Sequence, residues 1–231
     1  MTPDSGVSGV RIQEFPSNDE VAFLLESTRN ILLKRVLSAS LSSDLHTLGI
    51  GIQTMYGNTD AYKRRVADWQ KDAAFMEAVG PDSVIMQKMI HTFKTAYEMP
   101  FEAATEKGEP LLPATLRCVD YAHVHKDVVA SQIHWEIARL RDDLAWNIYL
   151  RMPEKGGELI LYPPAAASVV KERDIERFTP ISIETKPGDL VFFRSAIPHG
   201  VTRTSESDVR LTVSGCAGFE PSPERKGRYW A

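Results

Sequence analysis

The spacing of apolar residues changes once along the chain, near residue 105. Before this point apolar side chains recur every three or four residues, which places them on one face of a helix. Three segments have this spacing, residues 18–40, 59–80 and 81–100. Thr59 is a suitable N-cap for the second helix, and Gly80 follows its last apolar position. The pattern therefore predicts a mainly helical N-terminal layer over residues 1–105.

From residue 106 onward the chain consists of short runs rich in β-branched and aromatic residues, separated by glycine and proline. The runs are ATLRCVDY, LAWNIYLRM, GELILYPP, PISIETKP, DLVFFRSAIP, GVTRTS and VRLTVSGCAGF. Many short strands between turn residues are typical of an antiparallel sandwich or jelly roll. We therefore expect an α+β protein of one domain, residues 1–231. Residues 106–231 would form a double-stranded β-helix (jelly roll), with the N-terminal helices packed on one of its sheets.

The composition narrows the range of partners. A net charge of −4 and an isoelectric point near 5.9 disfavour nucleic acid and anionic membranes, which attract clustered lysine and arginine. No apolar run approaches the length that spans a bilayer, and the first residues lack the pattern of a secretion signal. The two cysteines, Cys118 and Cys216, lie far apart and suggest neither a disulfide framework nor a zinc ribbon. We expect a cytoplasmic protein with no nucleic-acid or membrane partner.

Metal-ligating residues concentrate at one place, since three of the six histidines lie in YAHVHKDVVASQIHW, residues 121–135. His125 and Asp127 form a His-x-Asp pair, and His199 follows a predicted strand much later in the chain. In a jelly roll the ends of neighbouring strands converge at the open mouth, so these three side chains can meet at one metal. Two histidines and one carboxylate on one face are the ligand set of non-haem Fe(II) oxygenases, whose remaining coordination positions stay open.

An arginine on the last long predicted strand extends this pattern. Arg210 follows His199 by eleven residues, and its planar guanidinium group can hold a carboxylate through two hydrogen bonds. Thr212, two residues on, projects to the same face and can add a hydroxyl donor. Together these residues describe a site for a dicarboxylate that chelates iron at one end and is held by Arg210 at the other. The obvious candidate is 2-oxoglutarate.

Taken in order, these motifs resemble the iron(II)/2-oxoglutarate-dependent oxygenases over roughly residues 111–219. The resemblance rests on the pieces HKD at His125, NIYLRMPEKGGELILY, KPGDLVFF, His199 and RLT at Arg210. Within that superfamily the stretches PATLR, MPEKGGEL and GFEPSPERKGRYWA are remotely similar to freestanding hydroxylases and aliphatic halogenases of hapalindole- and welwitindolinone-type alkaloids. The resemblance implies Fe(II), 2-oxoglutarate and O₂ as cofactor and co-substrates. It also implies a small-molecule natural-product substrate that no carrier protein presents.

The halogenases raise a second register for the iron ligands. They replace the metal-binding carboxylate by a small residue, so that chloride can bind iron, and their pattern H-V-G-x-D can be laid on residues 123–127. His123 would then be the first ligand. We favour His125 and Asp127, because they complete the ligand set; His123, on the same face of an extended strand, would lie beside the site and near the substrate.

Neither register leaves a position for chloride, so the expected reaction is hydroxylation of an unactivated C–H bond with release of succinate and CO₂. Halogenation, desaturation and cyclisation remain alternatives within the superfamily. A cupin-type metal dioxygenase that does not use 2-oxoglutarate would have no need of Arg210 with Thr212. A non-catalytic binding module would show degraded ligands.

Two residues of one predicted strand are candidates for the co-substrate site. Tyr149 aligns with a tyrosine that, in prolyl-hydroxylase-like relatives, bonds the far carboxylate of 2-oxoglutarate. Asn147 lies two residues earlier on the same face and can reach the same place. Trp146 points to the other face, as core or as a wall of the substrate pocket. Arg117 begins a predicted strand, and we expect it to be exposed or ion-paired.

The stretch SQIHWEIARLRDDLAW, residues 131–146, has helical spacing. Its pair His134 and Glu136 offers a third metal-binding possibility, but side chains two apart on a helix diverge. We expect instead a loop or short helix over the mouth, from which His134 and Trp135 contact the substrate. Residues 163–180 form an insertion of the kind that often serves as a lid. The sequence leaves the substrate, the regiochemistry and the oligomeric state open.

Overall fold

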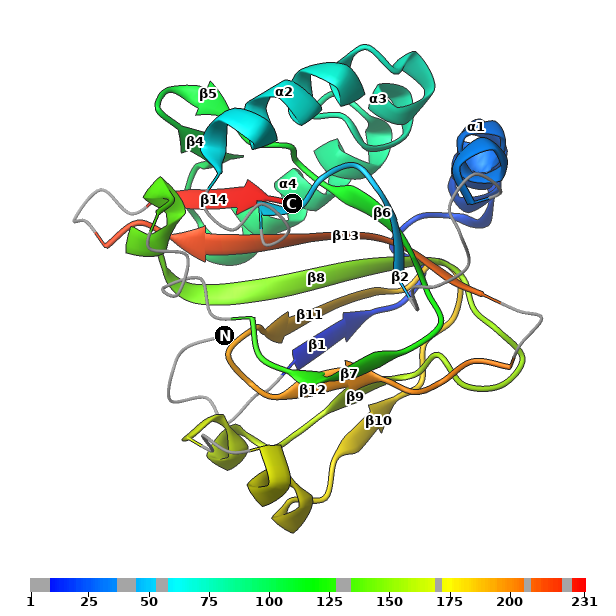
Figure 1. Ribbon diagram of the computed structural model, residues 1–231, viewed down its shortest axis with the longest axis vertical. Helices are drawn as coiled ribbons and strands as arrows, with labels where there is room; N and C mark the ends of the chain where they lie inside the picture. The colour runs from blue at the N-terminus through cyan, green and yellow to red at the C-terminus, as the bar shows by residue number, and fades with distance from the viewer. Residues whose placement is uncertain are drawn as a thin grey trace.

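A computed structural model describes residues 9–36, 45–52, 58–127, 134–168, 172–205, 209–221 and 226–231. Two sheets face each other, and helices cover the outer face of the larger sheet (Figure 1). The protein therefore combines antiparallel sheets with a helical layer, as the α+β prediction states. No helix in the described ranges is long and apolar enough to cross a membrane.

The larger sheet has eight strands, and β13 lies at its centre. Its main path runs β1 (Gly9–Ile12), β11 (Leu190–Arg194), β8 (Arg141–Arg151), β13 (Arg210–Phe219), β14 (Gly227–Trp230) and β3 (Phe101–Ala103). The first half of β13 also pairs with β6 (Thr115–Val119), which in turn pairs with β2 (Leu45–Leu48). All these pairings are antiparallel except that of β14 with β3.

The smaller sheet has four short antiparallel strands that face the first half of the larger sheet. Its order is β10 (Ile181–Ile183), β9 (Leu159–Leu161), β12 (His199–Val201) and β7 (Ala122–His125). Outside both sheets lie the hairpin of β4 (Thr105–Glu106) with β5 (Glu109–Pro110) and three 3₁₀ helices, η3 (Glu136–Arg139), η4 (Pro164–Ser168) and η5 (Glu172–Arg177). The last two lie within the predicted lid insertion, of which residues 169–171 are outside the described ranges.

The helices are α1 (Asn18–Val36), α2 (Thr59–Gln70), α3 (Ala73–Val79) and α4 (Val84–Tyr97). The prediction of a single helix over residues 59–80 is wrong, because the structure has two helices there, α2 and α3. Asp72 causes the break: its side chain accepts a hydrogen bond from Phe75 N, which caps a new helix. Asn58, and not Thr59, caps α2 by accepting from Ala61 N.

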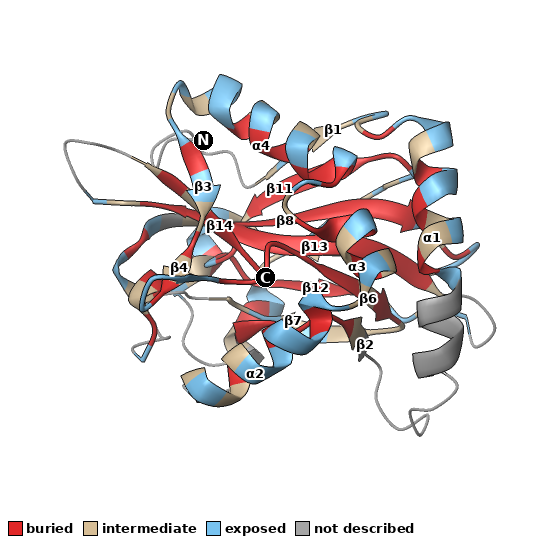
Figure 2. Cartoon of the chain, turned by 90° about the horizontal axis from the view of Figure 1, so that it is seen from above, coloured by how far each residue is buried: buried red, intermediate tan, exposed pale blue. Residues whose placement is uncertain are grey.

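The main core lies between the helices and the outer face of the larger sheet. Phe93 of α4 stacks on Phe101 with ring centroids 4.3 Å apart and meets Phe192 of β11 edge-on at 4.7 Å. Figure 2 shows the central strands β8, β11 and β13 almost entirely buried, while the helices keep an exposed outer face. A second, smaller cluster fills the space between the two sheets and comprises Ala145, Tyr149, Leu159, Leu161, Val191 and Phe193. The inner face of the larger sheet is thus available to build a site.

Strands β1, β2 and β3 of the N-terminal part were not anticipated, and the first two join the larger sheet at strands other than β14. β1 pairs with β11 and β2 with β6, so the N-terminal layer contributes to the sheet as well as covering it. Arg11 of β1 is held by the buried carboxylate of Asp189, its Nη2 lying 2.8 Å from Asp189 Oδ2. Strands β1 and β2 are four residues long, too short for a period of two to be recognised in the sequence.

Within residues 131–146, where the sequence analysis expected a loop or short helix, the described residues contain a short helix. Residues 131–133 lie outside the described ranges, only Glu136–Arg139 form a short 3₁₀ helix, and β8 begins at Arg141. The predicted strand of residues 200–205 likewise ends at Val201. In both places pairing with distant strands outweighs the local pattern.

Gly215→Ala should destabilise the protein, because Gly215 lies opposite Trp146 in the sheet. An added Cβ would stand 2.5 Å from Trp146 Cζ2 and 2.9 Å from the carbonyl oxygen of Trp230. Overpacking of this kind typically costs about 1–3 kcal/mol of the free energy of unfolding. Denaturant unfolding followed by tryptophan fluorescence measures it.

Gly108→Ala is the matched control, since no atom lies within 4 Å of its added Cβ. Its positive φ of 79° still favours glycine, so we expect a loss of about 1–2 kcal/mol from the backbone conformation alone. A loss for Gly215→Ala no larger than this control would contradict the tight packing of Trp146.

Candidate metal centre

The pairing of β7 with β12 aligns His125 with His199. Residues directly opposite each other in an antiparallel pair project to the same face. The two imidazole rings accordingly lie with their centroids 4.4 Å apart. Phe193 of β11 packs against the His199 ring at 4.7 Å from the opposing sheet. The two histidines of the predicted ligand set are therefore brought together by the backbone.

Both imidazoles are oriented by a hydrogen bond to the backbone carbonyl oxygen two residues earlier in the chain. His125 Nδ1 lies 2.7 Å from the carbonyl oxygen of His123, and His199 Nδ1 lies 2.8 Å from that of Ile197. Because a carbonyl only accepts, each Nδ1 carries the hydrogen and donates it. Each Nε2 is then left with its lone pair free to bind a metal, and its direction is fixed.

Asp127 completes the group. Its Oδ2 lies 3.6 Å from His199 Nε2 and 3.9 Å from His125 Nε2. The Asp127 backbone N–H donates to the carbonyl oxygen of Ser195, and Ser195 N–H donates to that of Asp143. These two hydrogen bonds tie the end of β7 to the larger sheet and hold the carboxylate against the imidazoles.

The charges of the group suit a divalent metal. Burial raises the pKa of Asp127, but its interactions with His199, His125 and Arg117 outweigh this and lower it to about 2. Burial and the neighbouring His199 lower the pKa of His125, against the opposing effect of Asp127. At neutral pH the carboxylate is therefore ionised and the His125 imidazole neutral, which are the forms that bind metal.

One ligand atom from each of His125, Asp127 and His199 lies within 4.8 Å of the other two. His199 is buried, whereas the His125 side chain is 45% exposed, so the group opens to solvent on one side. Two imidazoles and one carboxylate fit Fe(II) and leave coordination positions open for further ligands. No other such group of histidine, cysteine or carboxylate side chains occurs within the described ranges.

A buried cation lies deeper in the same pocket. Arg210 is 3% exposed, its Nη2 donates to the Tyr149 hydroxyl at 3.2 Å, and its Nε has no hydrogen-bond partner. In the part of the chain that the structure describes, no carboxylate lies within ion-pair distance of it. An unpaired buried charge is costly. The site therefore fits an anion that pairs with Arg210, as a dicarboxylate co-substrate would.

The remaining predicted co-substrate residues form a hydrogen-bonded chain beside Arg210. Thr212 Oγ1 lies 2.9 Å from Ser214 Oγ, which in turn donates to Asn147 Oδ1 at 2.6 Å. All three side chains are buried, and Asn147 and Ser214 line the same pocket as the histidines. Asn147 of β8 and Ser214 of β13 thus add polar side chains to the pocket that Arg210 and the histidines also line.

His123 is not part of the metal group, and the argument that placed it on the face of His125 is wrong. His199 pairs with His125 and Val201 with Ala122, so β7 contains one residue more than β12 between the two pairs. Such a bulge interrupts the alternation of side chains. His123 is exposed and its Nδ1 lies 3.3 Å from the Tyr121 hydroxyl.

The predicted substrate contacts from residues 134–146 fall in different places. Trp135 is 3% exposed and packs edge-on against Tyr62 of α2 at 5.2 Å, so its predicted contact with substrate is corrected to a role in the core. His134 is exposed. The Glu136 carboxylate accepts a hydrogen bond from Lys107 N and does not form a metal-binding pair with His134. Trp146 is fully buried; it belongs to the main core and also borders the pocket.

Among the pocket residues that the sequence analysis did not assign to the site are Arg117, Phe193 and Ser214. Ser214 continues the alternation that links Arg210 to Thr212, and this period could have identified it. Arg117 of β6 faces the pocket, whereas the sequence analysis expected it to be exposed or ion-paired. Only the pairing of β6 with β13 reveals that it shares a face with Thr212.

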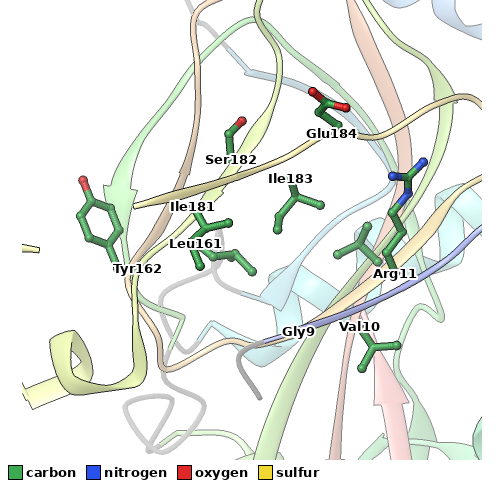
Figure 3. Close-up of a pocket in the computed structure, with 10 residues that line it drawn as sticks. Gly9, Val10, Arg11, Leu161, Tyr162, Ile181, Ser182, Ile183 and Glu184 are labelled. Carbon is green, nitrogen blue, oxygen red and sulfur yellow. The ribbon is translucent and has the colours of Figure 1, made fainter. Parts of the chain in front are cut away.

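A separate cavity of about 520 Å³ opens between β1 and β10 (Figure 3). Ile181 and Ile183 point toward Leu161 on its floor, while Ser182 and Glu184 point the other way. Arg11, at its edge, is already bound to Asp189. Unlike the pocket of the histidines, this cavity contains no group of metal-ligating side chains within the described ranges.

Comparison with known proteins gives one family and several similar structures. The family model described as carrier-protein-independent halogenase WelO5 matches residues 3–230. An N-substituted L-amino acid dioxygenase from Burkholderia ambifaria AMMD has a TM-score of 0.59 and 15% identity, covering 97% of this chain and 87% of that one. AviO1 from Streptomyces viridochromogenes Tue57 has a TM-score of 0.55 and 12% identity, covering 94% and 91%.

HygX from Streptomyces hygroscopicus, solved with nickel, 2-oxoglutarate and hygromycin B bound, has a TM-score of 0.51 and 12% identity, covering 94% and 86%. At these identities the structural similarity shows a shared fold alone. A search of curated proteins found no match.

Alanine substitution of any of the three predicted metal ligands should abolish metal binding, whereas substitution of the neighbouring His123 should not. We expect His125→Ala, Asp127→Ala and His199→Ala each to weaken Co(II) or Fe(II) binding more than about 100-fold, because residues that merely orient ligands already contribute about 10- to 100-fold. Anaerobic equilibrium dialysis measures the affinity. His123→Ala is the control and should bind metal as the wild type does; loss of binding in this variant would restore the alternative register.

Proposed function

We propose a function on one premise: the chain belongs to the family of the carrier-protein-independent halogenase WelO5, whose model matches it over residues 3–230. The sequence motifs identified the same superfamily, and its identification is confirmed. The protein is an enzyme of the iron(II)/2-oxoglutarate-dependent oxygenases, with Fe(II), 2-oxoglutarate and O₂ as cofactor and co-substrates.

The β-core is proposed to be a double-stranded β-helix. The eight strands from β6 to β13 divide equally between the two sheets, with β6, β8, β11 and β13 in the larger and β7, β9, β10 and β12 in the smaller. This distribution supports the jelly roll expected from the sequence. The N-terminal helices cover the outer face of the larger sheet, as that expectation states (Figure 1).

The proposed reaction is hydroxylation of an unactivated C–H bond of a small-molecule natural product, with release of succinate and CO₂. One observation carries this proposal: the carboxylate of Asp127 lies against both imidazoles, 3.6 Å from His199 Nε2 and 3.9 Å from His125 Nε2. Halogenases of this type have a small residue in place of that carboxylate. An intact carboxylate occupies the coordination position that chloride would need.

The roles of the residues follow from their positions. His125, Asp127 and His199 would hold iron on one face, and Arg210 would pair with the far carboxylate of 2-oxoglutarate. When bound, iron and 2-oxoglutarate supply, with O₂, the oxidising power to remove hydrogen from a C–H bond. Tyr149 accepts a hydrogen bond from Arg210 and orients it.

Other residues would shape the space around the reacting atoms. Asn147 and Ser214 line the pocket, and Ser214 is hydrogen-bonded to both Asn147 and Thr212. Leu159, Phe193 and Val201 form an apolar wall of the pocket, which excludes water from the reacting C–H bond.

Desaturation and cyclisation would use the same ligands and the same arginine, so they remain alternatives. The family description refers to enzymes that work without a carrier protein, and we propose that this chain likewise takes a free small molecule. We also propose a cytoplasmic location, which the two free cysteines support, since oxidising compartments favour disulfides.

Anaerobic addition of 2-oxoglutarate to the Fe(II)-loaded protein should produce a weak visible charge-transfer band. In Arg210→Gln the concentration needed for half of this band should rise about 30-fold or more, because a buried charge pair that loses one member costs about 2 kcal/mol or more. Arg64→Gln, on an exposed position of α2, is the control and should leave the titration unchanged. Absence of the band in wild type would favour a cupin-type enzyme instead.

Chloride should distinguish hydroxylase from halogenase chemistry. We expect chloride, compared with gluconate at equal ionic strength, to leave the wild-type absorption band unchanged because Asp127 occupies its position. In Asp127→Gly, loaded at an Fe(II) concentration high enough to saturate its weakened metal site, the same addition should shift the band. A chloride-dependent shift in wild type equal to that in Asp127→Gly would contradict the proposed role of the carboxylate.

A further inference from the structure

Arg117 is a cationic side chain of the pocket that has no role in the reaction described above. It lines the same cavity, of about 120 Å³, as His125, Asp127 and Arg210. The β6–β13 register places it directly opposite Thr212, so it projects to the inner face of the larger sheet. Its Nε donates to Thr115 Oγ1 at 3.2 Å, which directs the guanidinium group along β6 toward Thr115.

Arg117 and Arg210 stand on opposite sides of β13. Arg210 leans toward β8, where it bonds the Tyr149 hydroxyl, whereas Arg117 belongs to β6 on the other flank. The two also differ in depth. Arg210 lies opposite Val119, while Arg117 reaches toward Thr115, which pairs with Ser214. One small carboxylate held by Arg210 against Tyr149 therefore leaves Arg117 unpaired.

Arg117 lies in the same cavity as the metal group, whose three side chains His125, Asp127 and His199 also line it. Within the described ranges no carboxylate lies within ion-pair distance of Arg117. Arg117 as a residue is partly exposed, and beyond the bond from its Nε to Thr115 its guanidinium group has further donors for a ligand that enters the pocket.

The charges of the loaded pocket leave one cation without a partner. Iron(II) brings two positive charges and the two arginines one each, while Asp127 brings one negative charge and 2-oxoglutarate two. One positive charge remains, and Arg117 is the group that carries it. Because such a site favours a ligand of opposite charge, it would select an anionic substrate.

We propose that Arg117 binds a carboxylate of the substrate, so that the enzyme oxidises small organic acids. This inference rests on the proposed oxygenase function and specifies its substrate class. A planar guanidinium group can hold a carboxylate through two parallel hydrogen bonds, which fixes the orientation as well as the position of the bound acid. Arg117 is thus a specificity-determining residue that presents one C–H bond of the acid to the metal.

Matched acids and amides test this proposal directly. The probes are hexanoate, 3-phenylpropionate and indole-3-acetate, each with its primary amide, added to Zn(II)-loaded protein that contains saturating 2-oxoglutarate. Ligand-observed NMR titration gives each Kd without any turnover. In wild type at least one acid should bind about tenfold or more tightly than its amide, since a charge-assisted pair is worth roughly this factor.

Two arginine variants separate the substrate site from the co-substrate site. Arg117→Gln should abolish the preference for acid over amide while the Kd of 2-oxoglutarate changes less than about threefold. Arg210→Gln should show the reverse, with weakened 2-oxoglutarate binding and a retained preference measured at a concentration that saturates the variant. Arg117→Lys should keep part of the preference, because the charge remains but the second hydrogen bond is lost.

Three outcomes would overturn the proposal. Equal binding of acid and amide to wild type, or no binding of any pair, would mean that Arg117 recognises no substrate anion. A loss of 2-oxoglutarate affinity in Arg117→Gln as large as in Arg210→Gln would assign Arg117 to the co-substrate. If wild type fails to bind 2-oxoglutarate at all, the proposed function itself fails, and this result is distinct from the other two.

Discussion

The pairing of β7 with β12 is the constraint on which the site depends. Because opposite residues of an antiparallel pair share a face, the alignment of His125 with His199 brings two imidazoles together before any metal binds. A slip of one residue would turn His125 to the other face. Hydrogen bonds from Asp127 N to Ser195 O and from Ser195 N to Asp143 O fix this end of β7 against the larger sheet. The register of one short strand pair thus decides whether the protein has a metal centre.

Positive charge is the second organising feature of the pocket. Arg210 is almost fully buried with its Nε unpaired, and folding must bear the cost of removing that charge from water. An anion that enters the pocket offsets this cost, so the fold is prepared for an acidic ligand before it arrives. Asp127, whose pKa is lowered to about 2 despite its burial, supplies the negative charge of the metal group.

The helical layer packs on the outer face of the larger sheet and so makes the sheet that carries the pocket residues rigid. Trp146 packs over Gly215 and donates to the carbonyl oxygen of Cys216, which fills the outer face of β8 and β13 directly opposite the site. Phe93 of α4 continues the same layer against Phe101 and Phe192. Side chains on the inner face therefore rest on a closely packed sheet, which holds catalytic geometry better than loops do.

The sequence by itself determined the helical first part, the β-rich second part and the ligands His125, Asp127 and His199 as candidates. These rest on local periodicity and on residue chemistry, which a linear pattern carries. Only the tertiary structure decided what depends on distant pairing: that β1 and β2 join the larger sheet, that a bulge in β7 separates His123 from His125, and that Trp135 packs against Tyr62. It also decided that Arg117 faces the pocket, because the face of a strand residue is set by the partner strand, and β13 lies almost a hundred residues further along the chain.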